Sequence, residues 1–448
     1  MDLAGALRDL TPDFRGTVRI GVTGLARSGK TAFLTSLAAN LLAAGAGYRA
    51  LPALTLALAG RSLRVSLTPS GAGDVPRFDH ASHMAALAAD PPHWPHRTDA
   101  VSVLGLELEI GRAGLAARLP PRRIRLELVD YPGEWLLDLP LLGQDFSAWS
   151  AATLRRLDRQ PAARDFLAFA RGLPASAPAD GALEATGTAL YRAALHRLRD
   201  DAGLSLLQPG RLLMPAPGPA PPWTNFFPAI GHGGLAHLLG DRFDRYREVV
   251  RRNLAGPAFY GIDRLVVLAD LLTALHAGPD AYADAAAALE AVAGALRWRG
   301  WLPSWLPSWL QPGRIARVAF AASKSDHIGE RQRGNLAALM SALTRLPDDA
   351  TANRASFALA AMRCTEDVVW TLDGRPVSAV RGRMPGDDHP FRSYPGEVPA
   401  IPPTGAFWTH PFLALPPFEP LRLPLAGRAG IPHIDFDRVL VFLLEDVL

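Results

Sequence analysis

The stretch GLARSGKT, residues 24–31, decides the fold predicted for this chain of 448 residues. It matches the pattern G-x-x-x-x-G-K-[ST], in which the backbone N–H groups of a glycine-rich loop surround phosphate groups and the lysine contacts them. Apolar residues alternate over residues 17–24 and then recur at helical spacing over residues 30–45, which predicts a β-strand before the loop and an α-helix after it. Strand, glycine loop and helix in this order favour a phosphate-binding loop over an ordinary turn.

The loop and the first helical turn supply the predicted nucleotide-binding residues, which are Gly24, Ala26, Arg27, Ser28, Gly29, Lys30, Thr31 and Ala32. We expect Lys30 to contact the β- and γ-phosphates and to act in catalysis, and the Thr31 hydroxyl to bind Mg²⁺. Two roles stay open for Arg27: it neutralises the charge that develops during phosphate transfer, or it is simply an exposed loop residue.

The two lysines of the chain indicate two contacts with one ligand. Lysine occurs only at positions 30 and 324, although lysine and arginine together number 47. Lysine is a compact charge on a thin stem, whereas arginine presents a broad planar group, so a narrow site selects lysine. Lys324 and Asp326 follow a predicted buried strand over residues 314–323. The stretch resembles the guanine-specificity motif of GTPases, usually Asn-Lys-x-Asp, with Ser323 in place of the asparagine. The carboxylate of that motif accepts hydrogen bonds from two donors of guanine that adenine lacks, so the resemblance implies a guanine nucleotide, GTP or GDP.

A second acidic residue ends another predicted strand. In LELVDYPGE, residues 126–134, Asp130 closes a strand predicted over residues 122–130. Acidic residues in this position bind Mg²⁺ in P-loop proteins, and we favour that role over the capping of a turn. Gly133 offers its N–H to the γ-phosphate, and Glu134 occupies the position at which many GTPases have a water-orienting glutamine. We therefore expect hydrolysis that is slow or that uses another group.

The stretch WPHRTDAV, residues 94–101, contains Thr98, which is placed to close onto Mg²⁺ as a further ligand with a catalytic role. A plain threonine at the start of a strand is an equally good interpretation. Four histidines, at positions 80, 83, 93 and 96, also raise the question of a transition-metal site. We disfavour it because two of them flank a Trp-Pro pair, which is a poor context for shared ligation.

The predicted fold class is α/β: a three-layer, Ras-like P-loop NTPase domain with a mainly helical insertion and a small, proline-rich, partly β C-terminal segment. Strands are expected at 100–110, 122–130, 264–270, 314–323 and 355–363, and the stretch TLDGRPV predicts a hairpin turn at Asp373–Gly374. The expected division is 1–139 and 259–365 for the nucleotide-binding domain, 140–258 for the helical insertion, 366–432 for the proline-rich segment and 433–448 for a C-terminal helix.

The composition argues against nucleic acid as the main partner. The net charge is only +4, and the arginines are interleaved with acidic residues instead of gathering in one run. Cys364 is the single cysteine, so no internal disulfide forms. The N-terminal residues lack the pattern of a signal peptide, and the most apolar run, residues 265–278, is shorter than the ~20 residues of a spanning helix. We expect a cytoplasmic protein and leave contact with a membrane surface open.

The chain resembles the YcjX-like family of bacterial P-loop GTPases. The resemblance rests on GLARSGKTAF, WPHRT, DYPGEWLLDLP, PGRLLMP, FFP, DRLVVLADLLTALHAG, ASKSDH, MRCTED and PHIDFDRVLVFLL, which follow one another across nearly the whole chain. It implies a Ras-like domain, binding of GTP and GDP, a switch role in the bacterial stress or envelope response, and an inner-membrane protein partner. It also implies that Met362 and Arg363 lie near guanine. Ser323 departs from the threonine that is common in the family at this position.

The tract RWRGWLPSWLPSWLQPGR, residues 297–314, contains Trp301, Trp305 and Trp309. Tryptophan and arginine together suit a membrane interface, where the protein would be peripheral at the inner membrane. The prolines make a long regular helix improbable, however, so we favour a proline-rich loop whose rings pack on the protein itself.

The sequence thus predicts a GTP-binding switch protein that is a slow, Mg²⁺-dependent GTPase. An ATP-dependent phosphotransferase is the first alternative, and it would prefer adenine and not need Asp326. A membrane-surface adaptor with residual nucleotide binding is the second, and its membrane binding would survive Lys30→Ala.

Overall fold

The computed structural model describes residues 17–69, 75–95, 101–214, 220–254, 262–296, 315–345, 353–387, 389–409, 415–423 and 429–448. The chain divides into two compact units. The sheet unit contains residues 1–131, 261–276 and 305–448, and the helical unit contains residues 132–260 and 277–304. Each unit is built from segments that are separated in the sequence, and each is described by itself.

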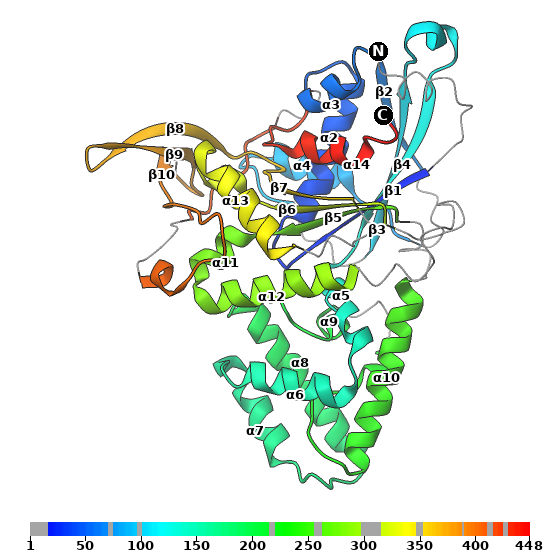
Figure 1. The fold of residues 1–448 in the computed structure, drawn as a ribbon, viewed down its shortest axis with the longest axis vertical. Helices are drawn as coiled ribbons and strands as arrows, with labels where there is room; N and C mark the ends of the chain where they lie inside the picture. Colours follow the sequence, from blue (N-terminus) through cyan, green and yellow to red (C-terminus); the bar gives the residue numbers. More distant parts are fainter. Residues whose placement is uncertain are drawn as a thin grey trace. The chain divides into compact units, whose positions relative to one another are not determined.

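A seven-stranded sheet forms the centre of the sheet unit, in the order β2-β3-β4-β1-β5-β6-β7 (Figure 1). The strands β4, β1, β5, β6 and β7 are parallel to one another, whereas β3 runs antiparallel to β4 and β2 runs antiparallel to β3. Their bounds are β1 (Thr17–Gly24), β2 (Leu63–Thr68), β3 (Ser102–Ile110), β4 (Arg122–Asp130), β5 (Arg264–Ala269), β6 (Arg317–Ala322) and β7 (Asn353–Ala358).

Helices flank this sheet and bury its central strands on both faces. Every residue of β5 is buried. Val266 and Leu268 belong to the same apolar core as α2 and α14, while Leu265 and Val267 alternate with them and point to the opposite face. The helices of this unit are α2 (Lys30–Gly45), α3 (Pro52–Ala57), α4 (His80–Ala88), α11 (Leu271–Ala277), α13 (Glu330–Leu343) and α14 (Phe436–Leu444), with short 3-10 turns η1 (Gly114–Arg118), η7 (Ser325–His327) and η8 (Gly405–Thr409).

A second, three-stranded antiparallel sheet follows β7 in the chain. It consists of β8 (Thr365–Leu372), β9 (Arg375–Arg383) and β10 (Pro390–Ser393), in the order β10-β9-β8. Leu372 pairs with Arg375 across the turn, and Asp373 and Gly374 both have positive φ, 48° and 75°. These are the angles of a two-residue hairpin turn of type I′, so the hairpin predicted at Asp373–Gly374 is confirmed.

The helical unit has its own core. Aromatic side chains dominate it: the ring of Trp149 stacks on that of Phe243 at 5.0 Å, and Phe226 meets Trp149 edge to face at 5.5 Å. Its helices are α5 (Gly133–Leu136), α6 (Phe146–Leu157), α7 (Arg164–Gly172), α8 (Gly181–Asp200), α9 (Gly210–Leu213), α10 (Gly234–Leu254) and α12 (Pro279–Leu296), with 3-10 turns η2 (Leu139–Gly143), η3 (Pro161–Ala163) and η4 (Pro222–Thr224). Compared with the helical segment expected at 140–258, the unit begins earlier and also contains 277–304.

The strands expected from the sequence are all present. The pair at 100–110 and 122–130 forms the antiparallel neighbours β3 and β4, and the two buried central strands are β5 and β6. Strand β2 was not predicted from the sequence, because its residues are half-buried or exposed and show no continuous apolar run. In the described part of the chain, no helix combines the length and apolar character needed to cross a membrane.

Candidate functional site

The glycine loop begins where β1 ends, and its first glycine has no room for a side chain. A Cβ atom on Gly24 would lie 2.3 Å from the carbonyl oxygen of Leu268 and 2.7 Å from the hydroxyl of Ser28. Leu25 N–H donates to the same Leu268 oxygen at 2.9 Å, which ties the loop to the end of β5. The loop therefore needs glycine here because the backbone of the neighbouring strand is too close.

The loop ends in a left-handed turn that starts α2. Gly29 has φ 83°, a conformation that glycine adopts without a penalty, and Lys30 is the first residue of the helix. The Lys30 ammonium donates to the Gly24 carbonyl oxygen at 3.2 Å, so the lysine side chain folds back over its own loop. Thr31 and Ala32 belong to the first turn of α2. The loop therefore joins β1 to α2 in the strand–loop–helix order that its motif predicts.

One buried polar group in the loop fits an anionic ligand. Ser28 is 1% exposed, and its hydroxyl has no hydrogen-bond partner among the residues the structure describes. A buried hydroxyl without a partner costs free energy, and a phosphate oxygen would accept its hydrogen bond. Ala26 beside it is half-buried, and Arg27 is exposed with φ 60°. Positive φ in a residue other than glycine is uncommon and occurs in turns and at functional sites.

Asp130 lies on the strand next to the glycine loop. It is the last residue of β4, it is 4% exposed, and its register partner on β1 is Val22. Both strands end at the same edge of the sheet because they are parallel, so Asp130 and the glycine loop share the edge at which ligands bind in open α/β sheets. Thr31 and Asp130 supply oxygen donors of the kind that Mg²⁺ prefers.

The predicted base-recognition loop follows β6 at the same edge. Ser323 N–H and hydroxyl both donate to the Ala269 carbonyl oxygen, at 2.9 and 3.3 Å, so this serine braces the loop against the end of β5. Lys324 has φ 60°, and its ammonium forms an ion pair with Asp270, which directly follows β5. The Asp270 side chain is 5% exposed and that of Lys324 39% exposed.

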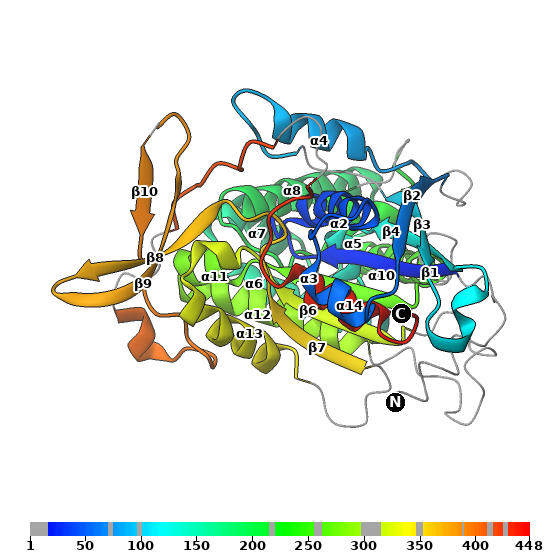
Figure 2. The same ribbon diagram turned by 90° about the horizontal axis from the view of Figure 1, so that it is seen from above.

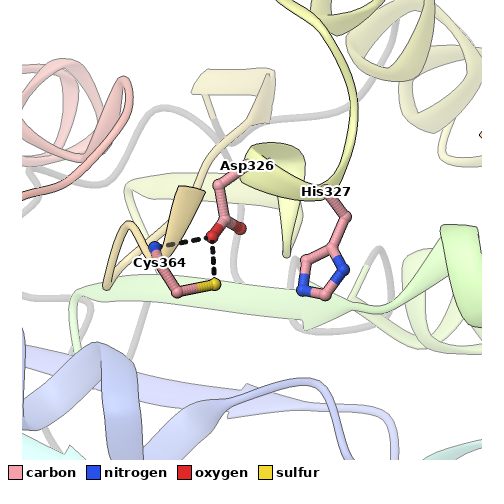
Figure 3. A group of neighbouring side chains, drawn as sticks. All are labelled: Asp326, His327 and Cys364. Carbon is pink, nitrogen blue, oxygen red and sulfur yellow. Dashed lines mark hydrogen bonds between the residues drawn. The ribbon is translucent and has the colours of Figure 1, made fainter. Parts of the chain in front are cut away.

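Asp326 is held by the segment that follows β7. It is 2% exposed, and its Oδ2 accepts hydrogen bonds from the backbone N–H of Cys364 at 2.9 Å and from the Cys364 thiol at 2.8 Å (Figure 3). The Thr365 hydroxyl donates to the Asp326 carbonyl oxygen. Burial raises the pKa of the Cys364 thiol, and the neighbouring Asp326 carboxylate raises it further, so the thiol is a protonated donor at neutral pH.

The same group has the residue types of a metal site. Ligand atoms of Asp326, His327 and Cys364 lie within 4.8 Å of one another. A metal ion binds the thiolate, whereas this buried thiol keeps its proton and donates a hydrogen bond to the carboxylate. We therefore interpret the three residues as a hydrogen-bonded cluster. Within the described residues, which do not include His96, the other histidines belong to no group with metal-ligand geometry.

Met362 and Arg363 make contacts inside the sheet unit. Met362 is 8% exposed and packs in a small apolar cluster with Ala39, Leu87, Leu423 and Ile431. The Arg363 guanidinium forms an ion pair with Asp367 at 2.8 Å, and its Nε donates to the Thr365 carbonyl oxygen. Their contact with guanine stays a prediction.

The other predicted residues lie elsewhere. Thr98 and the three tryptophans at 301, 305 and 309 are outside the described residues. Gly133 and Glu134 begin α5 in the helical unit, where Glu134 is 4% exposed. Asp270 and Cys364 were not predicted as the partners of Lys324 and Asp326. Asp270 could have been noticed, because it ends a predicted buried strand as Asp130 does; Cys364 gave no such signal.

A strand that enters a glycine loop and a helix, at the carboxyl edge of a mainly parallel sheet, defines a P-loop NTPase fold of the Ras-like class. The chain belongs to the YcjX-like family, DUF463, whose sequence model matches residues 18–448. It is 34% identical over 455 residues to the Ras-like GTPase YcjX of Escherichia coli K12, with 96% of each chain covered. It is 30% identical over 464 residues to the Ras-like GTPase YcjX of Shewanella oneidensis, covering 96% of this chain and 94% of that protein.

Proposed function

We propose that this protein binds GTP and GDP and hydrolyses GTP slowly in the presence of Mg²⁺, as a molecular switch. The observation that carries the proposal is the buried Asp326 carboxylate on the loop after β6, in the same sheet and at the same edge as the glycine loop after β1. The names of the two relatives, both Ras-like GTPases, support it.

At the phosphate end, the glycine loop surrounds the β- and γ-phosphates with N–H groups, and Lys30 exchanges its contact with the Gly24 oxygen for the phosphate oxygens. The N-terminus of α2 adds its positive partial charge. Thr31 and Asp130 hold Mg²⁺, which neutralises the charge of the phosphate oxygens when it is bound. Thr98 stays a candidate for a further ligand.

At the base end, Asp326 accepts the ring N–H and the exocyclic amine of guanine, and the stem of Lys324 lies along the base plane. Adenine presents a different pattern of donors and does not supply these two hydrogen bonds to the carboxylate, which costs affinity. The Asp270 ion pair supports this role because it holds the ammonium away from the base edge.

Slow hydrolysis is expected because Glu134 replaces the glutamine that orients the attacking water in many GTPases. A carboxylate near a polyanion orients water less well and adds repulsion. Arg27, exposed in the loop, is the candidate that offsets developing charge.

The family resemblance further supports a role in the bacterial stress or envelope response, at a cytoplasmic location, with an inner-membrane protein as partner. The helical unit is the proposed insertion in the nucleotide-binding domain, and the tryptophan tract is the proposed site of any membrane contact.

Titration with fluorescent GDP and ADP in Mg²⁺ tests the proposal. We expect the wild-type protein to bind GDP at least about a hundredfold more tightly than ADP, because ADP lacks both hydrogen bonds from the base edge to the Asp326 carboxylate. Lys30→Ala should lose both nucleotides, and Asp326→Ala should lose only the preference for guanine. The matched control is Asp280→Ala, an exposed acidic residue of the helical unit, which should change neither affinity. Phosphate release from GTP in the same samples measures hydrolysis.

Equal affinity for both nucleotides, unchanged in Asp326→Ala, would reject guanine specificity and favour the phosphotransferase. Binding of neither nucleotide would reject the nucleotide switch altogether.

A further inference from the structure

A buried serine without a hydrogen-bond partner lies beside Asp130. Ser102 is the first residue of β3 and is 3% exposed. Its hydroxyl has no hydrogen-bond partner among the residues that the structure describes. Such a hydroxyl costs free energy, because it has left water and no protein group has replaced the water. The Ser102 hydroxyl is therefore a candidate for a contact with a ligand.

The register of the sheet places this hydroxyl next to the Asp130 carboxylate. Ser102 lies directly opposite Asp130 in the antiparallel pair of β3 and β4. Side chains directly opposite each other point to the same face, with Cβ atoms about 4.5–5.5 Å apart. The next pair on this face, Leu104 and Leu128, belongs to the apolar core that includes α2. Ser102 and Asp130 therefore lie on the face covered by α2, whose first turn contains Thr31.

The start of β3 is held on both sides. Val103 pairs with Val129 of β4 on one side. On the other side, the Val103 N–H donates to the Pro76 carbonyl oxygen at 3.0 Å, and the Val103 carbonyl oxygen accepts from the Phe78 N–H at 3.1 Å. The backbone that carries Ser102 is thus fixed by the protein alone, before any ligand binds.

Hydrated Mg²⁺ has the chemistry that completes this hydroxyl. In the function proposed above, Thr31 and Asp130 supply oxygen donors to the ion, and Mg²⁺ in nucleotide sites keeps several of its water molecules. A water molecule bound to a dication is a stronger hydrogen-bond donor than free water, because the ion withdraws electrons from its O–H bonds. The carboxylate beside it can only accept, whereas a serine hydroxyl both accepts and donates.

We propose that Ser102 is a further residue of the Mg²⁺ site, whose hydroxyl accepts a hydrogen bond from a water molecule on the ion beside Asp130. This inference rests on the proposed function, since it requires Asp130 to hold Mg²⁺. Ser102 acts on the ion through water, so it is a positioning residue that adds to the affinity of the nucleotide-bound protein for the ion.

The Mg²⁺ dependence of GDP binding tests the inference. Fluorescent GDP is titrated into the full-length protein at a series of Mg²⁺ concentrations and in EDTA. In Ser102→Ala, the Mg²⁺ concentration that gives half of the Mg²⁺-dependent gain in GDP affinity should rise about fivefold, because one hydrogen bond to the hydrated ion is lost. The affinity for GDP in EDTA should be unchanged. The matched control is Ser66→Ala, which removes an exposed hydroxyl from β2 and should change neither value.

Thermal unfolding without nucleotide separates this role from a structural one. Ser102→Ala removes a hydroxyl that has no partner among the described residues, so the melting temperature should not fall. A lower melting temperature with an unchanged Mg²⁺ dependence would assign the hydroxyl to the stability of the protein and overturn the inference. GDP binding that is weakened by the same factor in Mg²⁺ and in EDTA would overturn it as well, because the effect would not act through the ion.

Failure of the inference and failure of the proposed Mg²⁺ site are distinguishable. A Mg²⁺ dependence that is unchanged in Ser102→Ala but lost in Asp130→Ala would overturn the role of Ser102 and leave the site in place. A Mg²⁺ dependence that is unchanged in both variants would overturn both.

Discussion

Each lysine of this protein is held by an oxygen at the carboxyl edge of the central sheet. Lys30 contacts the carbonyl oxygen of Gly24, and Lys324 contacts the carboxylate of Asp270. Asp270 also caps α11, since its carboxylate accepts from the N–H of Thr273 at 2.9 Å and from the Thr273 hydroxyl at 2.6 Å. One buried carboxylate therefore serves the helix and the lysine together.

Replacement of Asp270 by Asn separates these two roles. The amide still accepts the Thr273 N–H, so the melting temperature should change little, whereas the ion pair with Lys324 is lost. The freed ammonium turns toward water and its stem leaves the base plane, so we expect GDP affinity to fall about tenfold. Titration with fluorescent GDP measures this loss. Unchanged affinity would show that Lys324 is positioned without Asp270.

At the scale of elements, the C-terminal helix α14 supports the helix that carries the glycine loop. Phe436 of α14 is fully buried, and its ring centroid lies 4.8 Å from that of Phe33 in α2. Figures 1 and 2 show α14 beside α3. The Asp437 carboxylate accepts the N–H of Ala53 at 2.6 Å, where α3 begins. Helix α14 thus completes the core beside the helix that follows the glycine loop.

Removal of the Phe436 ring should destabilise the sheet unit. We expect Phe436→Ala to lower the free energy of unfolding by about 3–5 kcal/mol, because the ring leaves a cavity that the neighbours fill only in part. Phe442→Ala in the same helix is the matched control, since that ring is only half-buried and should cost less. Denaturant unfolding monitors both variants. Equal losses would contradict the packing seen between Phe436 and Phe33.

At the scale of the whole molecule, the helical unit contains a fully buried carboxylate that couples its stability to pH. Burial raises the pKa of Asp138 from 3.8 to about 6, against the opposing effect of the Tyr246 hydroxyl, which donates to it at 2.5 Å. Gly210 N–H donates to the other carboxylate oxygen at 2.7 Å. The folded state therefore binds the Asp138 proton more tightly than the unfolded state does.

This proton contributes stability that is fully present below about pH 4 and is lost as the pH rises through about 6. We expect the free energy of unfolding of the wild type to be higher at pH 5 than at pH 7, by about 1 kcal/mol from this group. Asp138→Asn cannot titrate, so the difference between the two proteins should vanish at low pH and grow toward pH 7. Chemical unfolding across this range measures it, and parallel curves for the two proteins would refute the role of Asp138.

The sequence by itself determined the parts of this protein that depend on neighbours in the chain. The glycine loop, its strand and its helix, the strand pair β3 and β4, the buried strands β5 and β6 and the hairpin at Asp373–Gly374 follow from local periodicity and turn chemistry, which act over a few residues. The P-loop fold class follows from them as well, because the motif has a defined place in that fold.

Only the tertiary structure decided how the candidate site is held together. The contacts of Lys324 with Asp270 and of Asp326 with Cys364 join residues far apart in the chain. No local sequence pattern predicts which strand ends become neighbours in the sheet. The edge strand β2, and the inclusion of residues 277–304 in the helical unit, were likewise decided by the tertiary structure. Each depends on long-range packing, whose free energy outweighs local preference and is absent from any short stretch of sequence.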